Sequence, residues 1–198
     1  MKFAVGGQPW EALRLTDVIA PRLRVLFVGI NPGVRSAETG HHFAGHSNRF
    51  WKLLWESGLV PEPITWVDDT RLPEFGFGIT NVIARPTPGI DSLSPAEYVA
   101  GWQVLERKIK KFKPAVVALV GVTVWRAIVP LLDVDEETRA VLRKSRCPGP
   151  QPVTVHGARI HVLPNPSGRN ANFSYGEMLE AFRALTQYLT ARNARAAK

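Results

Sequence analysis

Arg24-Val25-Leu26-Phe27-Val28-Gly29-Ile30-Asn31-Pro32-Gly33 is the stretch of this chain that decides the fold. Its first part is a short, almost wholly apolar run, which is typical of a strand buried on both faces of a parallel sheet. Asn-Pro-Gly then ends the strand, because proline fixes φ and glycine accepts a positive φ. The pattern returns where Arg159–Leu163 runs into Pro164-Asn165-Pro166-Ser167-Gly168. Since ligands bind beyond the carboxyl ends of parallel strands, the two turns predict one site, although each alone also fits ordinary turn chemistry.

Two further apolar runs, Phe77–Ile83 and Val116–Val120, have the same buried-strand character. Helical patterns lie between the strands, and strands that alternate with helices predict an α/β fold. We expect a three-layer αβα sandwich around a short, mainly parallel central sheet. The first expected helix is capped by Ser47, ends at Gly58 and carries Phe50, Trp51, Leu54 and Trp55 on one face. A second runs from the Ser94 capping box to about Lys111, a third follows Gly121 with Trp125 and Ile128 facing inward, and another runs from Tyr175 to about Ala191. Residues 133–145 are expected to form either a short helix or an ordered insertion.

The length of the chain limits the number of domains. Its 198 residues suffice for one sizeable core but not for two full domains. We therefore expect a single domain over residues 1–198, with its core at about 22–190 and a frayed basic tail at 191–198. The proline-rich stretches 61–73 and 147–152 predict loops.

Composition narrows the class of protein. Lys and Arg total 25 against 17 acidic residues, which gives a formal net charge of +8 and favours a polyanionic partner such as nucleic acid. The single cysteine, Cys147, excludes an internal disulfide and four-cysteine zinc or iron–sulfur sites. No apolar run approaches the ~20 residues that span a bilayer, and Met1–Gly7 is too short for a secretory signal. We expect a cytoplasmic protein with no membrane partner.

Several common catalytic motifs are missing. The glycine-rich segment Gly29–Gly40 lacks the Gly-Lys-Ser/Thr ending of a phosphate loop and the spacing of a dinucleotide fold, and no G-x-S-x-G elbow exists. The histidines in His41–His46 lack the spacing and partners of a metal site, so we expect no metal and no cofactor. What remains is a loop with Asn31, Ser36 and Phe43, faced by Asn81. Such a pocket suits a small planar amide, because an asparagine donates and accepts while a ring stacks on a base turned out of a duplex.

A set of ordered motifs resembles one known family, the mismatch-specific uracil-DNA glycosylases and their thymine-DNA glycosylase relatives. The resemblance runs from about Arg24 to Leu189. The motifs are Gly29-Ile30-Asn31-Pro32-Gly33, Ser36-Ala37, Thr39-Gly40, Phe43-Ala44, Asn48-Arg49-Phe50-Trp51, Thr80-Asn81, Arg85-Pro86-Thr87 and Leu163-Pro164-Asn165-Pro166-Ser167-Gly168.

The resemblance implies a monofunctional DNA glycosylase without a metal or cofactor. It would flip uracil, and related damaged pyrimidines, out of G·U mismatched double-stranded DNA and hydrolyse the N-glycosidic bond, leaving an abasic site. By the same carry-over, Asn31 positions the attacking water and Phe43 stacks on the flipped base. The base pocket would comprise Ile30, Gly33, Ser36, Phe43 and Asn81. The wedge that enters the duplex would comprise Asn165, Pro166, Ser167, Gly168, Arg169, Asn170 and Ala171. We expect a monomer, with single-stranded DNA as a second substrate.

The chain departs from the family at the wedge. Arg169 stands where the bacterial mismatch enzymes are expected to carry an apolar side chain. Arginine can stack its planar guanidinium between bases and also contact phosphate. We therefore expect the loop still to insert into the duplex, with a changed preference for a guanine opposite the flipped base. Asn170 and Ala171 then become less certain parts of the wedge.

The sequence leaves open which residue, if any, acts as a general base. Asn31 is neutral, and a missing general base costs roughly 10²–10⁴ in rate. Either the chemistry is slow or a carboxylate assists, and Asp91 is preferred to Glu38 because loops at strand ends converge on the site. Asp91 also fits a solvated acid near a helix start. An alternative from another class is a mismatch- or lesion-binding protein with negligible catalysis, which would have no need of a water-positioning asparagine.

Overall fold

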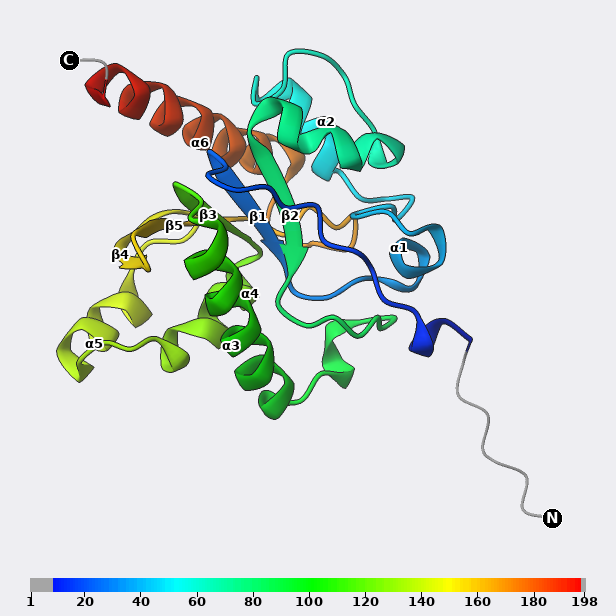
Figure 1. The fold of residues 1–198 in the computed structure, drawn as a ribbon, viewed down its shortest axis with the longest axis horizontal. Helices are drawn as coiled ribbons and strands as arrows, with labels where there is room; N and C mark the ends of the chain where they lie inside the picture. Colours follow the sequence, from blue (N-terminus) through cyan, green and yellow to red (C-terminus); the bar gives the residue numbers. More distant parts are fainter. Residues whose placement is uncertain (1–8, 197–198) are drawn as a thin grey trace.

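The computed structural model describes residues 9–196, and within them a five-stranded sheet forms the centre of the molecule (Figure 1). Its strands follow the order β2-β1-β3-β5-β4, and the first three pairings are parallel while β4 and β5 are antiparallel. The mainly parallel sheet is thus confirmed. The strands are β1 (Val25–Gly29), β2 (Phe77–Asn81), β3 (Val116–Val120), β4 (Gly149–Val155) and β5 (Ala158–Leu163).

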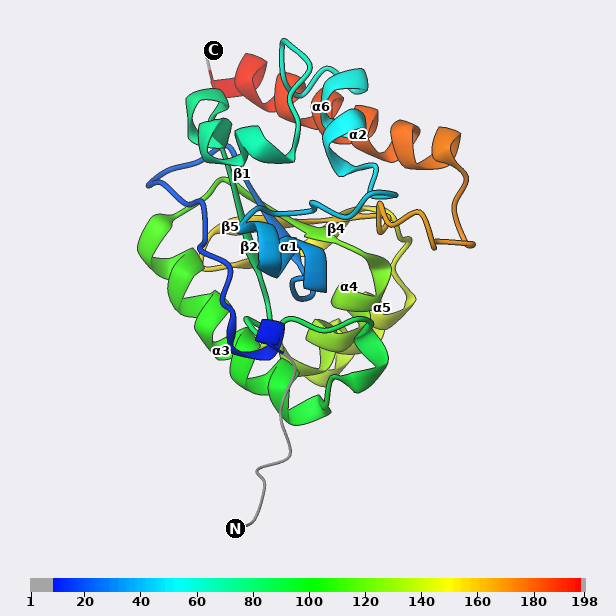
Figure 2. The same ribbon diagram turned by 90° about the vertical axis from the view of Figure 1, so that its right-hand side faces the viewer.

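Helices cover both faces of the sheet, which confirms the three-layer sandwich (Figure 2). Alternate residues of β1 show the two faces: Phe27 packs toward one helical layer, whereas Leu26 and Val28 pack toward the other. The first layer contains α2 (Phe50–Glu56) and α6 (Tyr175–Ala196), and the second contains α3 (Pro95–Phe112), α4 (Val122–Ile128) and α5 (Glu136–Lys144).

Several helix starts were predicted from local signals, with mixed outcomes. Ser94 caps α3 through both halves of a capping box, as expected. Ser47 does not cap α2; the helix begins at Phe50, whose N–H donates to Asn48 Oδ1 at 3.0 Å. Trp55, expected on the buried face of α2, is 44% exposed, and Leu53 is buried instead. The prediction was wrong there because helical periodicity over so short a segment leaves the buried face ambiguous.

The two proline-rich stretches are more ordered than predicted. β4 occupies most of 147–152 and continues to Val155, and a 3₁₀ helix, Trp66–Phe75, overlaps 61–73. Both loop predictions were therefore wrong. Pro150 and Pro152 are tolerated because β4 is an edge strand with a register shift, where a missing N–H disrupts few ladder bonds.

Two other segments form helix where none was certain. The helix α1 (Val34–Thr39) lies inside the predicted loop after β1, and α5 decides residues 133–145 in favour of a helix, capped by Asp135. The helix α6 continues to Ala196, into the stretch that was expected to be a frayed tail. Arg192 Nη1 donates to the carbonyl of Ala115 at 3.2 Å and so ties this end of α6 to the sheet.

The predictions for the two ends of the chain and for membrane-spanning helices have different outcomes. The segment Met1–Gly7 and the last two tail residues lie outside the described residues. Between residues 9 and 196, no helix has both the length and the apolar character needed to cross a bilayer.

Candidate active site

A cavity of about 180 Å³ opens beyond the carboxyl ends of the parallel strands. Asn31, from the turn after β1, and Asn165, from the turn after β5, both line it. Asn81 at the end of β2 and Val120 at the end of β3 complete the strand-end contribution. The structure thus brings the two Asn-Pro turns to one site, because they end strands on either side of β3.

The amide of Asn31 is held in one orientation by its neighbours. Its Nδ2 donates to Thr87 Oγ1 at 2.7 Å and to the carbonyl of Arg85 at 3.0 Å. The hydroxyl of Thr87 in turn donates to the carbonyl of Gly89 at 2.7 Å, so its oxygen is free to accept from Asn31. Within residues 9–196 no donor reaches Asn31 Oδ1. The network therefore leaves one acceptor available on a side chain that borders the cavity.

The segment that fixes Asn31 is itself anchored. The guanidinium of Arg85 pairs with Glu97 on α3, with Nε 2.8 Å from Oε1. Residues Gly33 and Thr87 also form a parallel bridge, and Thr87 N donates to the carbonyl of Pro32 at 3.1 Å. Thr87 is 3% exposed and lines the cavity. Sequence reasoning noted Thr87 only as part of a motif and missed its contact with Asn31, since no local pattern shows a bond between loops 56 residues apart.

Phe43 supplies the aromatic wall of the cavity. Its ring stacks on Phe50, with centroids 4.3 Å apart and an interplanar angle of 23°. Its backbone has φ of 51°, which is unusual for a residue with a side chain and marks a constrained loop. Ser36 Oγ accepts from Ala44 N at 3.0 Å, so this buried hydroxyl, expected to read the base, holds the Phe43 loop in place.

Asn81 provides a polar part of the cavity wall. Its side-chain amide makes no hydrogen bond within the described range, which leaves both its donor and its acceptor for a ligand. The amide lies over the backbone of Gly29, where an added Cβ would be 2.5 Å from Asn81 Oδ1. Gly29 is therefore required by the close approach of this side chain. A free amide next to a stacked ring matches the pocket expected for a planar amide.

The remaining predicted pocket residues differ in exposure. Ile30 is buried and Gly33 is exposed, and both line the cavity. The two candidate carboxylates do not: Asp91, in the 3₁₀ turn Ile90–Ser92, and Glu38 on α1 are both exposed and outside its wall. No Asp or Glu of the described residues lines the cavity. Asp91 nevertheless follows Ile90, which does line it.

His42 is a cavity residue that the sequence did not single out for this role. Its ring is 2% exposed, and Nε2 lies 3.0 Å from the carbonyl of Thr16. Burial lowers the pKa of His42, so the ring is neutral at pH 7 and donates from Nε2. Asp69 accepts from the backbone N–H of His42 and lies 2.9 Å from His41 Nδ1. The histidines thus brace the loop that carries Phe43.

The predicted wedge is a loop fixed at its base and exposed at its tip. Asn165 Oδ1 accepts from Ser167 N at 3.1 Å, and Asn170 Nδ2 donates to the carbonyl of Asn165 at 2.8 Å. A Cβ on Gly168 would lie 2.5 Å from Ser47 Cβ, so glycine is needed where the two loops touch. The base also includes Pro166, whose carbonyl accepts from Arg49 N at 2.9 Å, while Arg169 and Ala171 are exposed.

Comparison with known proteins places this arrangement in a family. Residues 16–190 match the family model described as the uracil DNA glycosylase superfamily, so the chain belongs to that superfamily. Its fold is also similar to the solution NMR structure of a protein described as a "putative uracil DNA glycosylase" from Methanosarcina acetivorans. That similarity has a TM-score of 0.56 at 17% sequence identity and covers 90% of this chain and 98% of the other.

Proposed function

We propose that this protein is a monofunctional DNA glycosylase of the mismatch-specific branch of its superfamily. It flips uracil, and related damaged pyrimidines, out of G·U mismatched DNA and hydrolyses the N-glycosidic bond, leaving an abasic site. The observation that carries the proposal is the oriented amide of Asn31, whose Oδ1 accepts no hydrogen bond from the described residues and lines the cavity with the stacked Phe43 ring and the Asn81 amide. The branch is supported by the ordered motifs from Gly29 to Gly168.

The cavity suits one small ring. Its volume of about 180 Å³ lies below the ~300 Å³ at which typical small-molecule pockets begin. Uracil would stack on Phe43 and exchange hydrogen bonds with Asn81, since the pyrimidine carries an imide edge that donates and accepts. Backbone N–H groups of the turn after β1 would stabilise the negative charge that the base gains as it leaves.

Asn31 would act on the water. Its Oδ1 accepts a hydrogen bond from a water molecule and aims the water oxygen at the anomeric carbon. A bond forms between that oxygen and the carbon while the bond from the carbon to the base nitrogen breaks, and the base leaves with the bonding electrons. The proton of the water must then go to solvent or to a carboxylate. We propose Asp91 as that carboxylate, which requires its exposed turn to approach when DNA binds.

The wedge would hold the duplex open around the extruded nucleotide. Arg169 at its exposed tip would stack between bases or contact phosphate, with Asn165, Ser167 and the rest of the loop as its support. We further propose that the protein acts as a monomer in the cytoplasm, on double-stranded DNA and on single-stranded DNA.

A glycosylase assay on labelled oligonucleotides tests this function. Purified protein is incubated with G·U, A·U and single-stranded uracil substrates, and abasic sites are revealed as strand breaks after alkali. We expect breaks at uracil, fastest in the G·U duplex, and none in undamaged controls. Tight binding of the same duplexes without any abasic product would instead establish a lesion-binding protein, an alternative consistent with the absence of carboxylates from the cavity wall in the described residues.

A further inference from the structure

Two more cavities continue the surface from the candidate active site past the wedge loop. The first, of about 280 Å³, shares Asn165 and Ser167 with the active-site cavity. The second, of about 680 Å³, shares Val122, Thr123 and Phe173 with the first and extends between α4 and the segment after α5. Together they form one path that leads away from the active site, which we name the arginine groove.

The charge of the groove has one sign. Arg169 lines its first part, and Arg126 on α4 and Arg143 on α5 line its second part. No Asp or Glu among the described residues lines either part. On the other side of the active site the pattern differs, because a cavity of about 310 Å³ there mixes Asp17 and Glu97 with basic side chains. The unmixed positive charge therefore lies on only one side of the active site, the side of the wedge loop.

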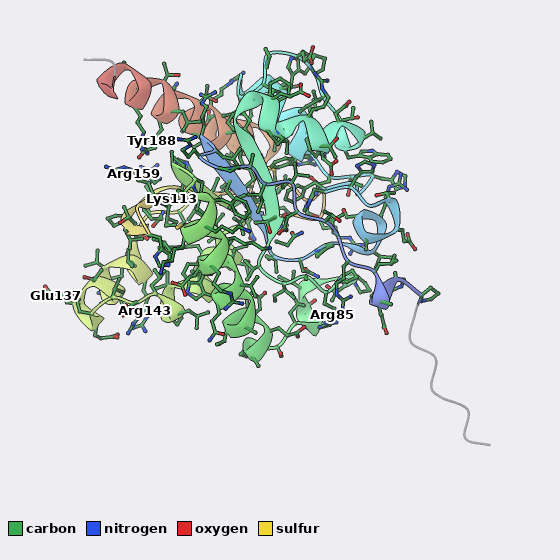
Figure 3. The ribbon with its side chains drawn as sticks, viewed as in Figure 1. Arg85, Lys113, Glu137, Arg143, Arg159 and Tyr188 are labelled. Atoms are coloured by element: carbon green, nitrogen blue, oxygen red, sulfur yellow. The ribbon has the colours of Figure 1, made fainter. Side chains whose placement is uncertain are left out.

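The arginines are available to an external anion. Within residues 9–196 no carboxylate lies within ion-pair distance of Arg126 or Arg169. Arg143 Nη1 does pair with Glu136 Oε1 at 2.8 Å, but both side chains are more than half exposed. Solvent screens an ion pair as exposed as this one, so Arg143 can exchange its partner for a phosphate. Glu137 lies at the outer end of α5, farther from α4 than Arg143 (Figure 3).

We propose that the arginine groove binds the sugar–phosphate backbone of the duplex arm on one side of the flipped nucleotide. The proposal rests on the proposed function, which puts the opened base pair at the wedge. The groove begins at that wedge, so the DNA it meets next is the flanking arm. Guanidinium groups match phosphate oxygens in bidentate geometry, and no Asp or Glu of the described residues lines the groove, where it would repel a phosphate. The footprint on DNA is then asymmetric about the lesion.

Binding to duplexes with unequal arms tests the groove. The probes carry a chemically stable abasic-site analogue opposite guanine, so that binding is measured without turnover, with both arms long or with one arm shortened. Wild-type protein is expected to lose about tenfold in affinity when one particular arm is shortened, and little when the other is. The double variant Arg126→Gln/Arg143→Gln should bind the long duplex about as weakly as wild type binds the truncated one, and should ignore the length of that arm.

Salt dependence gives a second readout. Loss of two phosphate contacts should reduce the slope of log affinity against log salt by about two. The matched control, Arg107→Gln/Lys110→Gln, removes the same charge from exposed positions near the end of α3, which leads into the amino end of β3, and should keep both arm dependence and slope. If the groove variant keeps the wild-type arm dependence, or loses no more affinity than this control, the groove does not bind the arm.

A duplex with both arms short separates this proposal from the proposed function. Excision of uracil from a short G·U duplex does not use the groove, so wild type and the groove variant should have equal single-turnover rates, which also shows that the variant is folded. If the wild-type protein excises uracil from none of the substrates, the proposed function is contradicted. The arm-length comparison would still show whether the groove binds the arm.

Discussion

Thr87 helps to fix which end of the Asn31 amide faces the cavity, and this is the least visible feature of the candidate site in the sequence. Its hydroxyl oxygen accepts from Asn31 Nδ2 because its proton is already donated to Gly89. Without that acceptor Nδ2 keeps only the carbonyls of Arg85 and Pro32, so the amide is held less firmly with its oxygen toward the cavity. The proposed function therefore makes Thr87 a positioning residue for Asn31.

Replacement of Thr87 by Val should therefore lower the single-turnover rate of uracil release by about 10- to 100-fold, the equivalent of one lost hydrogen bond of about 1–3 kcal/mol. Affinity for the abasic-analogue duplex should stay within about twofold. Thr87→Ser restores the hydroxyl and should restore the rate. A Val variant as fast as wild type, or a Ser variant as slow as Val, would contradict the positioning role.

Asp91 is the test of whether Asn31 acts alone. It is exposed and directly follows the cavity residue Ile90, and the helper role that we propose requires its turn to move toward the site. If it accepts the proton of the water, Asp91→Asn should slow single-turnover excision by about 10². Glu38→Gln, a change at another exposed acid of the motif loops, should have no effect. An unchanged rate in the Asp91 variant would exclude the helper.

At the scale of elements, β5 carries a buried histidine with no partner. His161 is 2% exposed, and neither ring nitrogen has a hydrogen-bond partner within the described residues. Its ring lies 6.0 Å from that of Tyr188 on α6. Burial lowers the pKa of His161 to about 4. The folded protein therefore resists protonation of a side chain that the unfolded chain protonates readily.

The sign of the pH effect follows from that difference. The pKa of His161 in the folded protein lies below its unfolded value of about 6.5. The contribution of His161 to the free energy of unfolding is therefore fully present above pH 6.5 and is lost as pH falls toward 4. Between pH 7.5 and pH 5, His161 should reduce the free energy of unfolding by about 2 kcal/mol. Urea unfolding of His161→Leu should lack this component, whereas His46→Gln, at an exposed site, should keep it. Identical pH dependence in wild type and His161→Leu would contradict the assignment.

Elements also show where sequence patterns succeed. The buried strands β1 and β3 and the capping box of α3 were predicted, because each is encoded by its own residues. The edge strand β4 was missed, since Pro150 and Pro152 argue against a strand unless its place at the edge is known. Likewise, α1 has only six residues and lies within a glycine-rich segment, so it has no recognisable helical pattern in the sequence.

For the molecule as a whole, the sequence predicted the architecture and which strand ends meet, but not the contacts within the site. Residues in strand-end turns, such as Asn31 and Asn165, converge because parallel topology requires it. The Asn31–Thr87 bond and the packing of Gly168 against Ser47 depend on how separate loops fold together. The function of these residues is still a proposal, whereas membership of the superfamily is shown by the match over residues 16–190.

Under the proposed function, the wedge connects the site to the duplex. Because Arg169 is exposed at the loop tip, Arg169→Ala should leave the cavity intact. Its single-turnover excision from a G·U duplex should fall about tenfold, since base extrusion loses the stacking or phosphate contact. Excision from single-stranded uracil DNA, which has no partner strand to open, should be unchanged. Equal losses on both substrates would show that Arg169 acts on something other than the duplex.

The central claim is that the oriented amide of Asn31 performs the chemistry in a site that binds an extruded base. Its most direct measurement is single-turnover uracil release by Asn31→Ala, together with the affinity of the variant for the abasic-analogue duplex. We predict a loss of at least about 10² in rate with affinity within about threefold of wild type. A variant that releases uracil at the wild-type rate would contradict the claim.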